Sequence, residues 1–327
     1  MEWRIEKSYR DNDSLRHSFN ELARATFHLD FEDWYQNGFW GDNYNPYSVV
    51  ADGRVVANVS VNRTDFRMAS GLTGAGGADG CRTDKGGADG NAAREAERKG
   101  EEGVSESGNI RHFLQLGTVM TDKDYRNRGF IRKIMEEIEA DYEGGTDGIY
   151  LFANDSVLDF YPKFGFEKSV EYQYSKKVQN TGKCRFEAVA MEDAAAWKRL
   201  QDAMDGNVFR CGVDMAGNHS LIMFNVTKIM RENVYYHKET DTYVIAEAEG
   251  EKVFLHNVFS GTLEDLDRVT ELFGENVKEV TLGFAPFERE KYLAKELHEA
   301  DCTFFVKGAG IKAVEGKKLR IPSLARA

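Results

Sequence analysis

The 327-residue sequence predicts an α+β protein in which two units of similar layout follow one another. Two observations carry this prediction. Runs of β-branched and aromatic residues alternate with segments whose apolar residues recur at helical spacing. The order of these strand and helix segments over residues 1–178 returns over residues 184–327. A chain of this length can bury a core in each of two domains.

Composition and charge exclude several classes of protein. The formal net charge is -12, whereas general nucleic-acid binding leaves a basic footprint. No apolar run is long enough to span a bilayer, and the N-terminal segment has no apolar signal core. The histidines and the widely spaced cysteines show no metal-binding pattern. We therefore expect a cytoplasmic protein with free thiols, no metal, no nucleic acid and no membrane partner; its oligomeric state stays open.

The first half opens with an alternating strand, "WRIEKSY", and a helix over residues 14–27. An aromatic and acidic stretch, "FHLDFEDWYQNGFW", comes next. Two β-branched runs around Asp52-Gly53 then predict a hairpin. From about residue 69 to 109 the chain is rich in Gly, Ala, Asp, Glu and Arg, with almost no large apolar residue. Such a segment cannot bury enough apolar surface to offset its ordering entropy, so we expect a disordered insertion.

Beyond the insertion, strand and helix signals resume. "RHFLQLGTVMTD" predicts a strand, and the helix after Gly129 has an apolar stripe that faces a core. "GIYLFAND" predicts a buried strand, "SVLDFYPKFGF" a short helix and "SVEYQYSKKV" another strand. The first unit then ends near Val178, and "QNTGK" is a plausible linker.

The turn "RNRGF" joins a strand to a helix and has three properties of a phosphate site. Helix N-termini offer unpaired N–H groups and a partial positive charge. A glycine lets the backbone approach an anion closely, and arginines add charge-assisted bonds. An isolated motif of this kind is more often a solvated turn. Neither a Walker loop nor a dinucleotide fingerprint is present.

The region from the strand before this turn to "KFGF" resembles the GNAT family of acetyl-CoA-dependent N-acetyltransferases. Arg126, Gly129 and Ile131 match the defined positions of the Q/R-x-x-G-x-G/A loop, although Ile131 replaces a small residue. Asn154, and Tyr161 seven residues later, match the downstream pattern. The resemblance implies the GNAT fold, a mixed and largely antiparallel twisted sheet flanked by helices. It covers residues 2–178, apart from the insertion.

The resemblance also implies roles for residues. The loop would cradle the pyrophosphate of acetyl-CoA, the co-substrate, and the strand at 116–121 would splay and point a backbone N–H at the thioester oxygen. Tyr161 would protonate the leaving thiolate; alternatively it packs beside Phe160. The implied acetyl-CoA residues are Val119, Met120, Thr121, Arg126, Asn127, Arg128, Gly129, Phe130, Ile131 and Asn154.

The acceptor pocket of GNAT proteins is lined by the segment after the first helix. Here that segment offers Asp30, Glu32, Asp33 and Trp34 as substrate-binding candidates. Carboxylates can bind an ammonium group and an aromatic ring can stack on it; equally, the acids can form a solvated helix start. We expect a small amine acceptor, with cationic amines preferred, and Glu32 and Asp33 are candidates for a base.

The second half repeats the GNAT order without obvious sequence identity. "SLIMFNVTKIM" is interpreted as a strand, and "EREKYLAKELHEA" as a helix before the last strand. Its counterpart of the basic turn, "FSGTLEDLD", has acids where the first half has arginines, so we expect no pyrophosphate there. The layout resembles enhanced-intracellular-survival-type acetyltransferases. We therefore expect an N-acetyltransferase with a second, degenerate GNAT-like domain; the alternative is a non-catalytic acyl-CoA sensor or scaffold.

Overall fold

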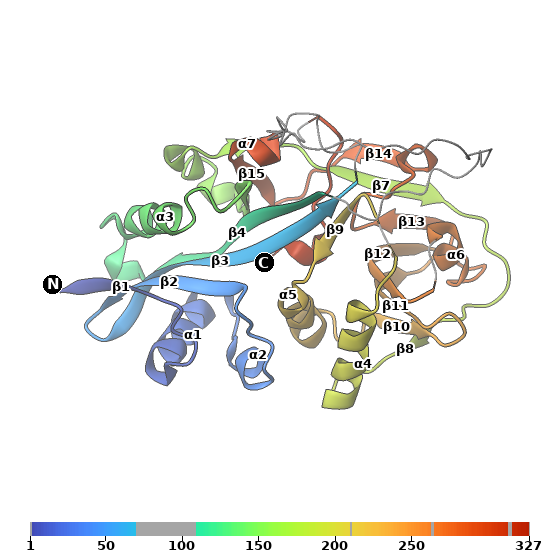
Figure 1. Cartoon of the computed structure of the whole chain (residues 1–327), viewed down its shortest axis with the longest axis horizontal. Helices are drawn as coiled ribbons and strands as arrows, with labels where there is room; N and C mark the ends of the chain where they lie inside the picture. The colour runs from blue at the N-terminus through green and yellow to red at the C-terminus, as the bar shows by residue number, and fades with distance from the viewer. Residues whose placement is uncertain (1, 70–108, 210, 263–264, 313–315, 327) are drawn as a thin grey trace, which may run out of the picture.

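The computed structural model describes residues 2–69, 109–209, 211–262, 265–312 and 316–326 (Figure 1). Residues 70–108 of the predicted insertion lie outside this description. Among the described residues, no helix is both long and apolar enough to cross a membrane, and no His, Cys, Asp and Glu cluster suits a metal ion.

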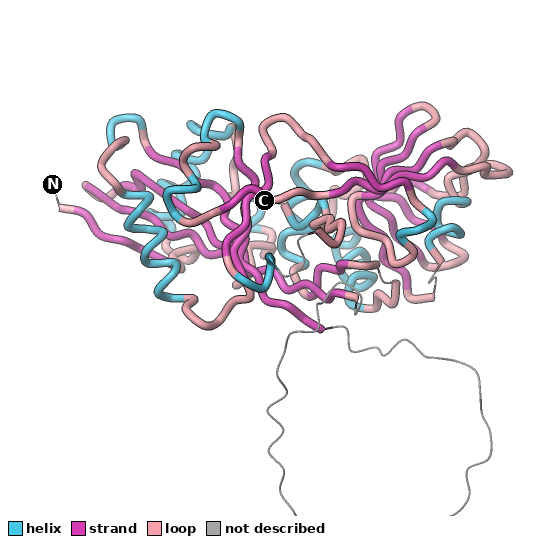
Figure 2. The backbone as a smooth tube through the Cα atoms, turned by 90° about the horizontal axis from the view of Figure 1, so that it is seen from above, coloured by secondary structure: helices cyan, strands magenta, loops and turns pink. Residues whose placement is uncertain are grey.

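The strands form two mixed, largely antiparallel sheets that lie side by side (Figures 1 and 2). The first sheet has the order β1-β2-β3-β4-β5-β15-β6, and β9 pairs with the far end of β3. Its strands are β1 Trp3–Lys7, β2 Tyr44–Ala51, β3 Arg54–Met68, β4 Asn109–Thr121, β5 Gly148–Ala153, β6 Glu167–Lys168, β9 Val213–Ala216 and β15 Thr303–Lys307.

The second sheet has the order β14-β7-β13-β12-β11-β10-β8. Its strands are β7 Tyr172–Lys177, β8 Glu187–Ala188, β10 Val234–His237, β11 Thr242–Glu249, β12 Lys252–Ser260, β13 Glu279–Leu282 and β14 Leu293–Glu296. The helices are α1 Asp13–Phe27, α2 Glu32–Gln36, α3 Phe130–Asp141, α4 Ala194–Asp205, α5 His219–Phe224, α6 Leu266–Glu271 and α7 Ala309–Lys312.

Each sheet is completed by a strand from the other half of the chain. β15 lies antiparallel to β5 and β6 in the first sheet, and β7 lies antiparallel to β13 and β14 in the second. The last described segment bridges the halves: the Tyr150 hydroxyl donates to the Ala325 carbonyl, and the Tyr174 hydroxyl donates to the Lys318 carbonyl. The domain boundary predicted between residues 178 and 184 therefore stays a prediction. β7 precedes it but lies in the second sheet, and β15 follows it but lies in the first sheet.

Helices α1 and α3 cover opposite faces of the first sheet, with α3 above it and α1 below it in Figure 1. Strand alternation explains this, because successive side chains point to opposite faces. Val50 and Val55 pack with α1, whereas Val49 and Val56 pack with α3. The apolar stripe of α3, with Ile134 at its centre, is buried as its periodicity predicts.

Three secondary-structure predictions were wrong. Residues 155–164 form two short 3-10 turns, η2 Asp155–Val157 and η3 Tyr161–Phe164, in place of one helix. The predicted strand at 220–230 is α5, capped by the Asn218 side chain, followed by a π turn; a short apolar run does not separate strand from helix. The predicted helix at 288–300 contains β14, because the edge of β7 supplies partners that override helical propensity.

Replacing residues 69–108 by a two-residue Asn-Gly turn is expected to preserve the fold. Met68 and Asn109 are partners in the β3–β4 ladder, so a tight hairpin can join the ends of the two strands. Each doubling of loop length costs only about 0.6 kcal/mol. Urea unfolding should therefore give a free energy within about 1–2 kcal/mol of the parent's, with unchanged acetyl-CoA affinity. A shortened chain that no longer folds would contradict this.

Candidate active site

The first sheet opens between β4 and β5. The two strands pair in parallel from Phe113 and Gly148 up to Leu116 and Leu151. Beyond this point β4 continues to Thr121, still paired with β3, while no β4–β5 pairing continues in the described residues. The predicted splay of the strand at 116–121 is therefore confirmed, and it leaves one side of this part of β4 open to a ligand.

A pocket of about 830 Å³ lies at this opening. It is lined by β4, the following turn, the start of α3, the η2–η3 region and the end of α1. All ten residues that the resemblance assigns to acetyl-CoA line it, and so does Tyr161. The structure thus brings these predicted residues together around one cavity, although their roles remain predictions.

The pocket is strongly positive although the protein is acidic. Four cationic side chains line it: Arg126, Arg128, Arg132 and Lys163. Among the residues that the structure describes, no Asp, Glu or His lines it. Arg132 and Lys163 were not among the predicted site residues, because neither occupies a defined motif position. Clefts lined by one sign of charge concentrate ligands of the opposite sign, so this pocket suits a polyanion.

The turn before α3 holds its backbone in a shape that favours anions. Asn127 and Gly129 both have left-handed φ angles, 61° and 75°. Gly129 is the N-cap of α3 and makes no side-chain capping bond, so the first N–H groups of the helix are not covered by a cap. A Cβ at Gly129 would meet nothing within 4 Å. The glycine is therefore required by its φ angle and not by protein packing.

The arginines of this turn are exposed but are held by local contacts. Arg126 Nε donates to the Thr121 carbonyl at 3.4 Å. Arg128 donates to the Asp124 carbonyl at 2.9 Å, and its guanidinium lies 4.8 Å from the centre of the Tyr125 ring. The Arg132 guanidinium lies 5.0 Å from the centre of the Phe164 ring. A contact to a carbonyl or a ring orients a guanidinium group without neutralising its positive charge.

A bulge in β4 aims the backbone at the pocket. The β3–β4 register shifts between Asn58 and Ser60, so two residues of β4, Thr118 and Val119, oppose one residue of β3. Thr118 has a φ of 43°, which is rare for a β-branched residue. The bulge reverses the alternation of side chains: Leu116 packs on the α3 face and Met120 on the α1 face.

A buried polar network holds this bulge. Asn58 Nδ2 donates to the Thr118 carbonyl at 2.9 Å, and Thr118 Oγ1 donates to Ser60 Oγ at 2.5 Å. The Tyr44 hydroxyl lies 3.0 Å from Thr118 Oγ1, and Ser48 Oγ donates to Asn58 Oδ1 at 2.8 Å. Asn58, Ser60 and Ser48 are fully buried. Strained backbone persists only where its surroundings determine it, and this network supplies those surroundings.

Asn58→Ala is expected to lower kcat about three- to tenfold while leaving the acetyl-CoA dissociation constant within about twofold, since one hydrogen bond contributes about 1 kcal/mol. Asn58 is buried and does not line the pocket but holds the Thr118 carbonyl, so it is a positioning residue. The matched control is Asn218→Ala, because buried Asn218 likewise donates to a β3 carbonyl, that of Arg63, away from the pocket. Equal loss of kcat in both variants would argue against this role.

Tyr161 reaches the pocket from a buried position at the start of η3. Its side chain is 6% exposed, and its ring packs against Phe160, Phe166 and Phe305 at 5.4, 6.1 and 5.8 Å between centroids. Phe305 belongs to β15, so a strand from the second half positions this ring. Burial raises the pKa of the Tyr161 hydroxyl to about 12, which keeps the phenol protonated.

The four predicted acceptor residues lie outside the pocket lining. Asp30 pairs with Arg24, Glu32 with the buried Arg16 at 3.0 Å, and Asp33 with Lys228 at 2.5 Å. Arg16 lowers the pKa of the Glu32 carboxyl through their hydrogen bond, so Glu32 is ionised and engaged. Trp34 is 2% exposed and donates its indole N–H to the Ser220 carbonyl at 3.1 Å. The end of α1 contributes Thr26, Phe27 and Leu29 instead.

In the second half, β12 and β13 also separate beyond their paired region, but another segment of the chain occupies the gap between them. β12 and β13 pair in parallel up to Leu255 and Leu282, and β12 continues to Ser260. The segment before β9 then bridges the gap: Val208 N donates to the Ser260 carbonyl and Gly212 N to the Ala285 carbonyl, both at 2.7 Å. A Cβ at Gly212 would come within 3.0 Å of the Ala285 carbonyl oxygen, so this close approach requires glycine.

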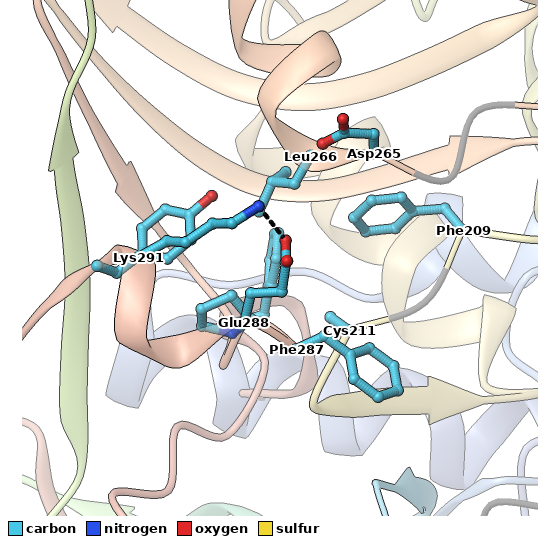
Figure 3. Close-up of a pocket in the computed structure, with 10 residues that line it drawn as sticks. Phe209, Cys211, Asp265, Leu266, Phe287, Glu288 and Lys291 are labelled. Atoms are coloured by element: carbon cyan, nitrogen blue, oxygen red, sulfur yellow. Dashed lines mark hydrogen bonds and ion pairs between the residues drawn. The ribbon is translucent and has the colours of Figure 1, made fainter. Parts of the chain in front are cut away.

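The described residues of the turn before α6 also differ from those of an anion site. Its N-cap is Asp265, whose carboxylate accepts the Asp267 N–H at 2.8 Å and adds negative charge where the first half has Gly129. Residues 263 and 264 of this turn lie outside the description. A pocket of about 300 Å³ remains beside it (Figure 3). In it the Lys291 ammonium meets the Glu288 carboxylate at 2.6 Å.

The sequence matches no family model and no curated protein at a significant level. The structure resembles that of a conserved protein from Enterococcus faecalis V583 described as a probable N-acyltransferase. The TM-score is 0.57 at 13% identity, covering 96% of this chain and 74% of that one. It also resembles Eis1 from Mycobacterium abscessus, with a TM-score of 0.50 at 11% identity, covering 93% of this chain and 72% of that one. The chain therefore has the GNAT fold, as the resemblance in its sequence implies.

Proposed function

We propose that the protein is an N-acetyltransferase. It moves an acetyl group from acetyl-CoA to a primary amine of a small acceptor, by direct attack while both are bound. The observation that carries this proposal is the pocket at the β4–β5 opening, which has four cationic side chains, no acidic one, and Tyr161 in its wall. The comparisons support the fold; the activity and the co-substrate are our inference.

The residues of the pocket fit acetyl-CoA in charge and in shape. The phosphates would bind at the Arg126–Gly129 turn and the N-terminus of α3, where uncapped N–H groups and guanidinium groups converge. The apolar walls, including Leu116, Val119 and Phe152, suit an uncharged pantetheine arm. A pocket of about 830 Å³ is within the range of ligand sites.

A backbone N–H group and the Tyr161 hydroxyl would take part in catalysis. A backbone N–H of β4 near Val119 or Met120 would stabilise negative charge on the thioester oxygen, at a position that the Thr118 bulge and Asn58 fix in advance. Tyr161 would give its proton to the leaving thiolate. Its pKa of about 12 suits an acid, because the phenol holds its proton at neutral pH.

The amine must lose a proton, and no described Asp, Glu or His lines the pocket to take it. Glu32 and Asp33, the bases considered from the sequence, are committed to ion pairs with Arg16 and Lys228. We therefore propose that the amine enters in its neutral form or passes its proton to water. The rate should then rise with pH as more of the amine becomes neutral.

The second half would serve the first as a scaffold: β15 places Phe305 against Tyr161, and the filled splay leaves that half without a matching site. We also propose a cytoplasmic location, because Cys184 and Cys302 are present as thiols.

Two measurements on the purified chain test the function. Calorimetric titration with acetyl-CoA asks whether the pocket binds it, and a thiol-release assay with a panel of primary amines asks whether acetyl transfer follows. Binding with amine-dependent CoA release supports the enzyme. Binding without release for any amine would favour the sensor or scaffold, and no binding would overturn both.

A further inference from the structure

We infer that the acceptor is an amine with an apolar or aromatic group near its amino group, rather than a polyamine. This inference rests on the proposed function and concerns the end of the pocket beside α1. It differs from the preference for cationic acceptors that the acidic and aromatic stretch at 27–40 suggests. The argument begins with the two ends of the pocket.

The pocket has residues from both faces of the first sheet, because the splay opens the sheet between β4 and β5. The cationic side chains belong to the turn before α3, to α3 and to η3. The end of α1, which packs on the other face, contributes Thr26, Phe27 and Leu29. A polyanionic co-substrate would occupy the cationic end, so the α1 end remains for the acceptor.

The α1 end presents apolar surface to solvent. Phe27 is 37% exposed and Val157, from η2 in the same pocket, is 36% exposed. Leu29, which also lines the pocket, is half-buried. Large apolar side chains exposed within a concave site usually contact a ligand. An acceptor that covers these side chains with a ring or an alkyl chain gains from removing both surfaces from water.

Among the residues that the structure describes, this end has no carboxylate to pair with a second positive charge. The nearby carboxylates of Asp30, Glu32 and Asp33 are paired with Arg24, Arg16 and Lys228, and none of the three lines the pocket. The phosphates of the co-substrate would already balance the four cations at the other end. A second ammonium group would therefore lose water without gaining an ion pair, which is unfavourable.

The reaction with such an amine balances without another reactant. The neutral amine nitrogen forms the C–N bond to the acetyl carbon, and the C–S bond breaks. The thiolate takes the Tyr161 proton, and the proton that the nitrogen sheds passes to water and in turn restores Tyr161. The products are an N-acetyl amide and CoA.

Two amines of equal size separate the alternatives. Pentylamine and 1,4-diaminobutane differ only in having a methyl or an amino group at the far end. We expect kcat/KM for pentylamine to exceed that for 1,4-diaminobutane by about tenfold or more, and 2-phenylethylamine to be at least as good as pentylamine. Calorimetric titration of each amine into the CoA-loaded protein should give the same order of affinity.

Substitutions at Phe27 test whether the preference for apolar amines arises at the α1 end of the pocket. Phe27→Ala should raise KM for 2-phenylethylamine about tenfold with the acetyl-CoA dissociation constant unchanged, and Phe27→Glu should bring 1,4-diaminobutane level with pentylamine. Ile229→Ala is the matched control, since Ile229 is a 59% exposed apolar residue outside the pocket. Tighter binding and faster turnover of 1,4-diaminobutane by the parent protein would overturn the inference and leave the acetyltransferase standing. Failure of acetyl-CoA to bind would instead remove the proposed function.

Discussion

Arg126→Ala is expected to weaken acetyl-CoA binding roughly tenfold or more. A hydrogen bond to a charged group contributes about 1.5–3 kcal/mol, and about 1.4 kcal/mol is a factor of ten in affinity. The side chain is exposed and lines the pocket, so its loss should not disturb the fold. Lys123→Ala is the matched control, because Lys123 is an exposed cation three residues earlier that does not line the pocket.

Gly129→Val should weaken binding at least as much, for a different reason. The φ of 75° is a left-handed conformation that valine adopts only with strain, about 1–3 kcal/mol. The added side chain would stand in open space on the ligand side of the turn. Gly144→Val imposes the same backbone conflict, at a φ of 72°, in the loop after α3 and away from the pocket. Gly261→Val, in the corresponding turn of the second half, should not change affinity.

Calorimetric titration of acetyl-CoA measures all five variants, and circular dichroism shows whether each is folded. Loss of affinity in Arg126→Ala and Gly129→Val, with Lys123→Ala, Gly144→Val and Gly261→Val near the parent value, would support the phosphate site. Unchanged affinity in both pocket variants would remove it. A loss shared by Gly129→Val and Gly144→Val would indicate strain rather than ligand contact.

The residues of the basic turn and of the Asn154–Tyr161 pattern could be placed at one pocket from the sequence because they form two short motifs; their roles remain predictions. Arg126 to Ile131 lie on one turn and the start of one helix, and Asn154 and Tyr161 lie on the two turns after β5. Local chain geometry brings the members of each motif together. The splay of β4 then joins the two motifs around one pocket, as the resemblance implied.

The acceptor end could not be predicted in this way, because it depends on long-range pairing. A sequence shows that Glu32 and Asp33 are acidic, but not that Arg16 and Lys228 neutralise them. Lys228 is far away along the chain. Phe27 looked like one more apolar position of α1, although its exposure in the pocket distinguishes it from buried Phe19. The carboxylates of Glu32 and Asp33 are already paired within the fold, which weakens the expectation that they bind a cationic acceptor.

Local sequence patterns could not predict that β7 joins the second sheet and β15 the first. Each strand was predicted correctly as a strand, but the choice of sheet depends on contacts between halves. In the same way, Asn58 and Ser60 alternate with valines as ordinary strand residues. Only the shifted register with β4 shows that they hold a bulge at the pocket.

Tyr161→Phe is expected to reduce kcat by about 10²-fold while leaving acetyl-CoA affinity almost unchanged. General acid catalysis contributes about 10²–10⁴-fold, and the substitution removes only the hydroxyl. The ring contacts with Phe160, Phe166 and Phe305 remain, so the fold and the pocket wall should persist. Tyr292→Phe is the matched control, because Tyr292 is a buried tyrosine that lines the smaller pocket of the second half.

The pH dependence of kcat gives an independent test of the same role. The ordinary pKa of a tyrosine is about 10, and burial raises that of Tyr161 to about 12. A general acid acts only while protonated, so activity should be lost as the pH rises through the pKa. At the ordinary value half of the acid form would be gone at pH 10, whereas at about 12 nearly all of it remains. The parent kcat should therefore show no alkaline decline up to about pH 10.5. A decline centred near pH 10, or full activity in Tyr161→Phe, would show that another group or water protonates the thiolate.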